Sequence, residues 1–188
     1  VLESGDGYAR LQDAVDAIGT GTGSIRIAPG RYGDCAVQTA GQVAYLAGAP
    51  GQVTFDGGAC EGKATLVLRG AAARVEGIIF QNIRVPDKNG SGIRLEKGNL
   101  AVLQSWFRDS EQGILSGDDP ASTITVEKST FTRLGGCPNG MCSHSLYIGN
   151  YGGLSVTRSR FEHGTGGHYV KSRAAVAGGC ASCCVTSA

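Results

Sequence analysis

The sequence has almost no net charge and no long hydrophobic run, and each absence narrows the possible functions. Its 17 lysine and arginine residues nearly balance 16 aspartate and glutamate residues, which gives a formal net charge of +1. A near-neutral chain has no general attraction to polyanions, so we expect neither nucleic acid nor a membrane as a partner. No apolar run approaches the roughly 18 residues of a membrane-spanning helix.

Glycine, in contrast, is abundant. The chain of 188 residues contains 31 glycines, more than twice the ordinary share of about 7%. Many of them stand at the ends of short alternating segments, where glycine suits tight turns. No shift in composition marks a second domain, so we expect one domain with a continuous core.

A repeated pattern runs through the chain and is clearest in residues 91–107. There, a short alternating strand meets a turn at Lys97-Gly98-Asn99, and a second strand leads to Ser105 and Phe107. Similar units end at three other phenylalanines, so that the four are spaced roughly 24 to 30 residues apart. A period of this length, built from short strands and glycine-rich turns, is typical of a solenoid. The four phenylalanines are Phe80, Phe107, Phe131 and Phe161.

We interpret the period as an all-β fold, a single-stranded right-handed parallel β-helix in which equivalent strands stack about 4.8 Å apart. The four phenylalanines should then form one inward ladder, and Ile93, Ile114 and Leu146 another. A two-sheet sandwich is the structural alternative, but its strands need not end in the same Ser-x-Phe. A leucine-rich repeat would need a fixed leucine frame that is absent here.

The ends of the chain differ from the repeats. Apolar residues in 8–18 recur at helical spacing, which predicts an α-helix that caps the first coil. We place the β-helix domain at residues 1–174 and an irregular, cysteine-rich tail at 175–188, because the alternating pattern stops after Ala174. An uncapped end exposes strand edges, so we expect self-association through the C-terminal end or a disordered tail.

Several segments resemble a known family. Tyr8-x-x-Leu11-Gln12-x-Ala14-Val15, followed by Ile25-x-Ile27-x-Pro29-Gly30-x-Tyr32, resembles the cap and first coil of pectin-lyase-like β-helix proteins. Residues 89–96, 112–115, 143–149 and 167–174 are similar to bacterial right-handed parallel β-helix repeat proteins. This architecture hosts lyases, hydrolases, epimerases, esterases and adhesins. The resemblance implies an exported bacterial protein whose partner is a polysaccharide, and we expect an acidic one.

Seven cysteines allow disulfides or a metal site. Cys137 and Cys142 flank a turn sequence, and Cys35 could meet Cys60 across the first coil. An oxidising setting would allow both bridges, and we expect a secreted or periplasmic protein. Zinc is the alternative, but the spacing lacks a second cysteine pair. We therefore favour disulfides or free thiols.

Candidate site residues are those that face outward on one stacked sheet, where successive coils can form a groove. Counting from the phenylalanines predicts an outward patch with Arg173, His144 and the pair Asp118-Asp119 at its ends. The same count places His168 in the inward ladder, where we interpret it as structural. The predicted outward residues are Arg94, Glu96, Tyr147, Tyr169 and Lys171.

The resemblance favours a polysaccharide lyase that cleaves by β-elimination at a uronic acid. Such an enzyme must neutralise a carboxylate, remove the proton α to it, and protonate the leaving oxygen. Lys171 or Arg173 could neutralise the carboxylate or act as base, with His144 as an alternative base. Tyr147 or Tyr169 could donate the proton.

Two further interpretations of the patch remain open. A glycoside hydrolase needs two carboxylates across a cleft, for which Asp118 with Asp119, or Glu96 with Asp118, are the candidates. A glycan-binding or structural module without turnover could instead use the rings of Tyr147, Tyr151 and Tyr169 to stack on sugars, with Arg94 and Glu96 beside them.

Asp118 and Asp119 also offer hard oxygen ligands, for which calcium is the expected metal. The segment Gly117-Asp118-Asp119-Pro120 has an ordinary turn as its alternative interpretation. Outward lysines and arginines on a solenoid can likewise simply be solvated.

Overall fold

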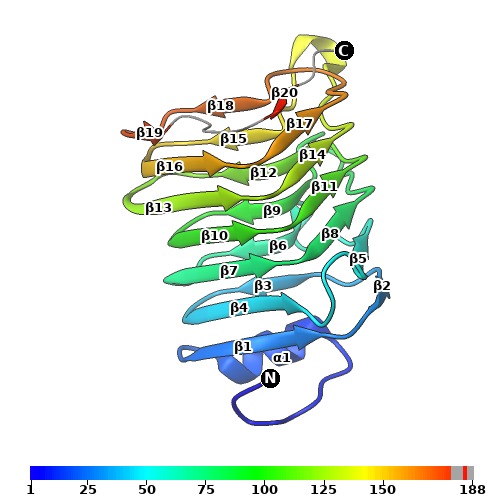
Figure 1. Ribbon diagram of the computed structural model, residues 1–188, viewed down its shortest axis with the longest axis vertical. Coiled ribbons are helices and arrows are strands. Elements are labelled where there is room, and N and C mark those ends of the chain that lie inside the picture. The colour runs from blue at the N-terminus through cyan, green and yellow to red at the C-terminus, as the bar shows by residue number, and fades with distance from the viewer. Residues whose placement is uncertain (179–183, 186–188) are drawn as a thin grey trace.

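The computed structural model describes residues 1–178 and 184–185, which form a right-handed parallel β-helix. Three parallel sheets run the length of the solenoid, with the N-terminal coil at one end and the C-terminal coil at the other (Figure 1). We call them sheets A, B and C in the order in which the chain visits them. Because every ladder between the strands is parallel, the two-sheet sandwich is excluded. The pairs include β1 with β4, β2 with β5 and β3 with β6.

Sheets A and B each have seven strands. The strands of sheet A are β1 (Thr22–Ile27), β4 (Gln42–Ala47), β7 (Ala72–Glu76), β10 (Asn99–Leu103), β13 (Asp119–Glu127), β16 (Tyr151–Thr157) and β19 (Ala177–Gly178). The strands of sheet B are β2 (Gly30–Tyr32), β5 (Val53–Asp56), β8 (Ile78–Gln81), β11 (Trp106–Arg108), β14 (Thr130–Thr132), β17 (Arg160–Glu162) and β20 (Cys184–Val185).

Sheet C has six strands and carries the candidate site. A short 3-10 helix, η1 (Pro138–Gly140), lies in the connection from sheet B to sheet C that precedes β15. The strands of sheet C are β3 (Ala36–Gln38), β6 (Ala64–Leu68), β9 (Ser91–Leu95), β12 (Gln112–Ser116), β15 (Leu146–Ile148) and β18 (Val170–Ser172).

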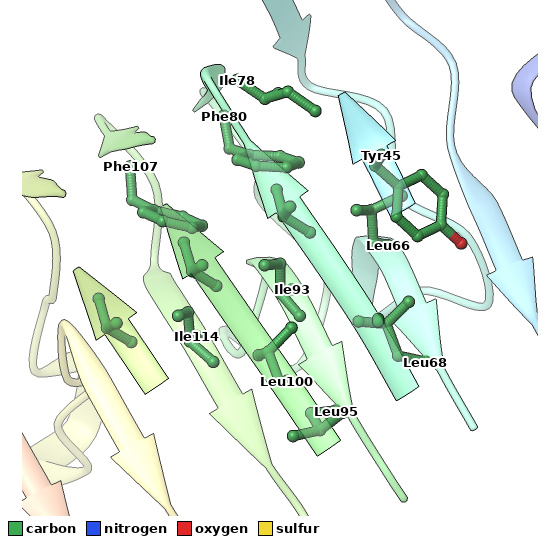
Figure 2. Close-up of a cluster of buried hydrophobic side chains, with 14 of the residues drawn as sticks. Tyr45, Leu66, Leu68, Ile78, Phe80, Ile93, Leu95, Leu100, Phe107 and Ile114 are labelled. Carbon is green, nitrogen blue, oxygen red and sulfur yellow. The ribbon is translucent and has the colours of Figure 1, made fainter. Parts of the chain in front are cut away.

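The aromatic ladder predicted from the period is confirmed. Phe80, Phe107, Phe131 and Phe161 are in register, and successive ring centroids lie 5.1, 4.8 and 4.8 Å apart with nearly parallel planes. Phe55 extends the stack toward the N-terminus. Figure 2 shows Phe80 and Phe107 stacked beside aliphatic rows from sheet C. One of these rows is the predicted inward ladder of Ile93, Ile114 and Leu146, all fully buried.

The corner between sheets A and B explains the repeated serine. Ser105, Ser129 and Ser159 each donate a hydroxyl hydrogen bond to the carbonyl two residues earlier, at 2.9 Å. The same hydroxyls accept N–H bonds from the coil below, as when Ser129 N donates to Ser159 Oγ at 3.2 Å. The buried backbone of a sharp corner is thereby satisfied without water. The residue before each serine has a positive φ, as Lys128 has at 50°.

The predicted N-terminal cap is also confirmed, as helix α1 (Leu11–Ile18). It buries Leu11, Ala14 and Val15 over the first coil. The side chain of Gln12 accepts from Val37 N at 2.7 Å and donates to Val37 O at 3.1 Å. It thereby takes the place that a further strand would occupy at the edge of sheet C, which protects that edge.

Both predicted disulfides are present, between Cys35 and Cys60 and between Cys137 and Cys142. The predicted tail lies partly outside the described residues, and so do Cys180 and Cys183. In the described part, β19 pairs with β16 and β20 with β17, so sheets A and B continue past residue 174. Within the described ranges, no helix combines the length and apolar character needed to cross a bilayer.

Candidate functional site

The candidate site lies on the outer face of sheet C. Strand register places Arg94 beside Leu115, Leu115 beside Tyr147, and Tyr147 beside Lys171 on four successive coils. We call this row the outer column. Because neighbouring parallel strands lie about 4.8 Å apart, the side chains of the column lie next to one another on the outer face of the sheet. Arg94, Tyr147 and Lys171 therefore share the outer face as predicted, but Lys171 takes the position in the column where the count from Phe161 puts Tyr169.

A cavity of about 340 Å³ opens along this column, and we call it the sheet C cavity. Three residues of the outer column line it, Arg94, Leu115 and Tyr147, and so do residues at the turns that lead from sheet C to sheet A. Asn89, on the connection before β9, belongs to its lining. The lining residues are Asn89, Arg94, Leu115, Ser116, Gly117, Asp118, Tyr147, Gly149 and Arg173.

Two cations lie over the ring of Tyr147. The Lys171 ammonium is 4.6 Å from the ring centroid, and the Arg173 guanidinium carbon is 5.7 Å from it. Cations at these distances are attracted by the negative face of the ring. The ring thus holds two positive charges at the cavity and is not a free platform for a sugar.

Glu96 is bound to cations outside the cavity. Its carboxylate oxygens lie 2.7 Å from Lys63 Nζ and 2.5 Å from Arg69 Nε. Glu61 pairs with the same two cations. Although burial acts in the opposite direction, hydrogen bonds from Lys63 and Arg69 lower the pKa of Glu96. The carboxylate therefore holds neighbouring coils together and is absent from the cavity lining.

Arg94 is less engaged than Glu96. Its Nε is 3.8 Å from the nearest Glu96 oxygen, beyond hydrogen-bonding distance, and is buried without a hydrogen-bond partner among the described residues. The ion pair with Glu96 is thus loose, and a guanidinium without a hydrogen-bonded carboxylate is well suited to bind a carboxylate from a ligand.

His144 is buried beside this group, with 5% of its surface exposed. Its ring meets Tyr147 edge to face at 5.3 Å, and its Nδ1 accepts the backbone N–H of His168 at 2.8 Å. Burial, with smaller effects from the charges of Lys171 and His168, lowers the pKa of His144. The neutral imidazole therefore carries its proton on Nε2, so Nδ1 is not available as a base.

The predicted inward placement of His168 is wrong. Val170, not His168, continues the row of Ile93, Ile114 and Leu146, and His168 is exposed. Residues 163–169 form a longer connection than 109–111, so counting seven residues from the phenylalanine ends too early. Tyr169 is also not outward as predicted. It is partly buried against the core, with its ring centroid 6.0 Å from that of Phe161.

The predicted use of Tyr151 as an outward sugar platform is wrong too. Tyr151 is 0% exposed and belongs to the hydrophobic core. Its hydroxyl has no hydrogen-bond partner among the described residues, and burial raises its pKa. The ladder between β13 and β16 is irregular between Asp119 and Thr123. Tyr151 lies at this irregularity, where strict alternation along a strand fails.

Asp118 and Asp119 point to different partners. Asp118 lines the cavity, and its Oδ1 accepts from Asn150 N at 2.7 Å. Asp119 Oδ2 accepts from Gly98 N and Ser122 Oγ, both at 2.8 Å. In residues 1–178 and 184–185, no group of three or more His, Cys, Asp or Glu side chains is placed to hold a metal ion. The two aspartates do not converge as a ligand pair.

Asn89 and Ser116 are cavity residues that the sequence analysis missed. Ser116 Oγ accepts from Gly149 N at 2.9 Å and fixes the turn of the next coil. Asn89 lies in residues 82–90, a connection whose length matches no other coil, so alignment on the repeat could not place it. Its neighbour Gly90 is the only sequence signal, since Asn-Gly marks a turn.

Comparisons with protein families, with curated proteins and with solved structures found no match for this chain.

Proposed function

We propose that the protein binds an acidic polysaccharide in the sheet C cavity and cleaves it by β-elimination at a uronic acid. The observation that carries this proposal is that Arg94, Tyr147 and Arg173 line one cavity, with the Lys171 ammonium 4.6 Å from the ring centroid of Tyr147. Three cations favour a polymer with carboxylates, and the β-helix architecture is consistent with a carbohydrate-active protein. A further premise is that the cavity is open to solvent along the solenoid.

The roles follow from what β-elimination requires. The proton α to the carboxylate is removed, the electron pair forms the new double bond, and the glycosidic oxygen leaves with a proton. Arg94 and Arg173 are always charged and would neutralise the carboxylate, which stabilises the negative charge that develops. Tyr147 and Lys171 are the proton-transfer groups that remain, because His144 Nδ1 and Tyr169 are occupied elsewhere.

The hydrolase alternative has less support. Among the residues that line the cavity, Asp118 is the only carboxylate, and Glu96 is held by Lys63 and Arg69. A hydrolase needs a second carboxylate about 5 to 9.5 Å away. Glycan binding without turnover is the second candidate, since the same three cations would retain an acidic chain whether or not a proton is transferred.

Calcium and location are further proposals. Calcium at Asp118 and Asp119 stays a prediction, and no step of the mechanism is derived through a metal. The two disulfides support export to an oxidising compartment, either secreted or periplasmic. Self-association through the C-terminal end also stays a prediction, because part of that end lies outside the described residues.

The test is a turnover assay on pectate and on alginate, with calcium and with a chelator. Ultraviolet absorbance of unsaturated products and reducing ends are measured in the same sample. We expect both signals to rise together, and both to fall in Lys171→Ala but not in Lys128→Ala, a lysine far from the cavity. Reducing ends alone would establish a hydrolase. No rise in either signal, together with retention of the protein on a polyuronate gel, would support glycan binding without turnover.

A further inference from the structure

The connection 82–90 contributes Asn89 to the lining of the sheet C cavity, and it is held in place by side chains from later coils. The carboxylate of Glu111, which is 5% exposed, accepts from Val85 N at 3.1 Å and from Gly90 N at 2.7 Å. Ser143 Oγ donates to Lys88 O at 2.7 Å. The connection is therefore fixed at Val85, Lys88 and Gly90 before any ligand binds.

The amide of Asn89 is also oriented. Gln112 Nε2 donates to Asn89 Oδ1 at 2.9 Å. The Nδ2 of Asn89 makes only a long contact of 3.4 Å with the carbonyl oxygen of Asp87. With its oxygen engaged and its nitrogen nearly free, the exposed amide at the cavity presents a hydrogen-bond donor.

Gln112 has an unusual environment for a residue of purely structural importance. It is 1% exposed, and its Oε1 is buried without a hydrogen-bond partner among the described residues. A buried carbonyl without a partner destabilises the folded state. The hydrogen bond from Gln112 Nε2 to Asn89 does not remove that cost, because Oε1 still has no partner among the described residues. An apolar side chain of similar size would avoid the cost, and Asn89, being exposed, could then bond to water.

We propose that Asn89 is a substrate-contacting residue of the sheet C cavity, that its Nδ2 donates to an uncharged hydroxyl of the acidic polysaccharide, and that Gln112 is its positioning residue. This inference rests on the proposed function. The cations bind the carboxylate, and Asn89 reads the hydroxyl pattern of the sugar beside it. A site built to bond a hydroxyl discriminates against sugars in which that hydroxyl is blocked.

The first test uses pectate or alginate, whichever retains the wild-type protein more strongly when it is immobilised on a gel. Dissociation constants are then measured for that polyuronate. All variants carry Tyr147→Phe, so that no turnover occurs during binding. We expect Asn89→Ala to weaken binding about fivefold, the effect of one lost hydrogen bond. Asn99→Ala is the matched control, because Asn99 Oδ1 also accepts a hydrogen bond, from Thr123 N at 2.8 Å, but on sheet A.

Acetylation of the same polyuronate tests the hydroxyl directly. Blocking the hydroxyls should weaken binding by the background protein about fivefold and should have little further effect on Asn89→Ala. Equal losses in the two proteins would overturn the contact between Asn89 and a hydroxyl.

The positioning role predicts a separation of stability from affinity. Gln112→Met should keep or raise the melting temperature while weakening binding about threefold. Gln81→Met is the contrast. Gln81 is also buried, but it donates to Asp56 Oδ2 at 3.0 Å and accepts from Arg108 Nε at 2.8 Å. That change should lower the melting temperature and leave binding unaltered.

The outcomes separate the two proposals. If Arg94→Ala weakens binding while Asn89→Ala and Gln112→Met do not, the inference fails and the proposed function stands. If the wild type is retained by neither polyuronate, the proposed function fails and the inference fails with it. A lower melting temperature in Gln112→Met with unchanged affinity would make Gln112 purely structural.

Discussion

The ammonium of Lys171 lies 4.6 Å from the ring centroid of Tyr147, and Lys171 follows Tyr147 by one coil on sheet C. This contact gives Tyr147 two separable properties, a ring that holds cations and a hydroxyl that can transfer a proton. The predictions that follow separate the residues that act on a polysaccharide from those that maintain the solenoid.

Tyr147→Phe and Tyr147→Leu should differ. Phenylalanine keeps a ring for Lys171 and Arg173, so we expect polyuronate affinity to be retained while turnover is lost. Leucine removes the ring as well, and affinity should fall about two- to fivefold, the size of an exposed cation–π contact. Dissociation constants and unsaturated-product formation test this. Full turnover by Tyr147→Phe would remove the hydroxyl from the mechanism.

Glu96→Gln should affect stability and leave polysaccharide binding intact. It breaks the contacts with Lys63 and Arg69, and because the network is partly exposed we expect a loss of about 1 kcal/mol in the free energy of unfolding. Urea unfolding at pH 7 measures it. The control is Glu127→Gln, which removes contacts with Arg158 and Lys128 on sheet A. Weaker binding at unchanged stability would restore the predicted binding role of Glu96.

His144 should make the fold sensitive to mild acid. Burial lowers its pKa in the folded state, so below the ordinary histidine value of about 6.5 the unfolded chain binds a proton that the folded chain resists. The free energy of unfolding therefore falls as the pH decreases. His144→Asn keeps an acceptor for His168 N and should flatten this dependence between pH 7.5 and 5.5.

Melting temperatures across that range test the effect of His144. His163→Asn is the matched control, because His163 is exposed and has a φ of 51°, a conformation that asparagine tolerates. An equal flattening in the control variant would show that the dependence does not come from His144.

The two disulfides should contribute unequally to stability. Cys35 and Cys60 are 25 residues apart in sequence, and Cys137 and Cys142 are 5 apart. Constraining the unfolded chain stabilises the fold more for the longer loop. Double alanine variants should lose about 3.5 and about 2 kcal/mol respectively by this argument. Guanidinium unfolding measures both, and a larger loss for the shorter loop would contradict the prediction.

The sequence was sufficient to predict the fold because the phenylalanine at the end of each unit recurs in register. Phe107 and Phe131 identify equivalent positions on sheet B without reference to loop lengths. Arg94 and Tyr147 could be aligned for the same reason, since each follows an inward residue of sheet C. The same count puts Lys171 two residues out of register, because it starts from Phe161.

The parts that could not be predicted lie where that register is interrupted. His168 and Tyr169 lie within a connection of different length, and Tyr151 lies opposite the irregular part of β13. The position of Asn89 depends on its hydrogen bond with Gln112 and on those that Glu111 and Ser143 make with the same connection, which no local pattern contains. A count from the nearest phenylalanine gives no information about such contacts.

The corner between sheets A and B has a consequence for how such a protein can change in evolution. Its serine hydroxyls bond from coil to coil, so an insertion at Ser129 would break the row above and below it. The connections from sheet B to sheet C, which include 82–90 and 133–145, already differ in length. Variation is thereby directed to the side that borders the cavity, where a new loop can alter recognition while the stacked core is inherited unchanged.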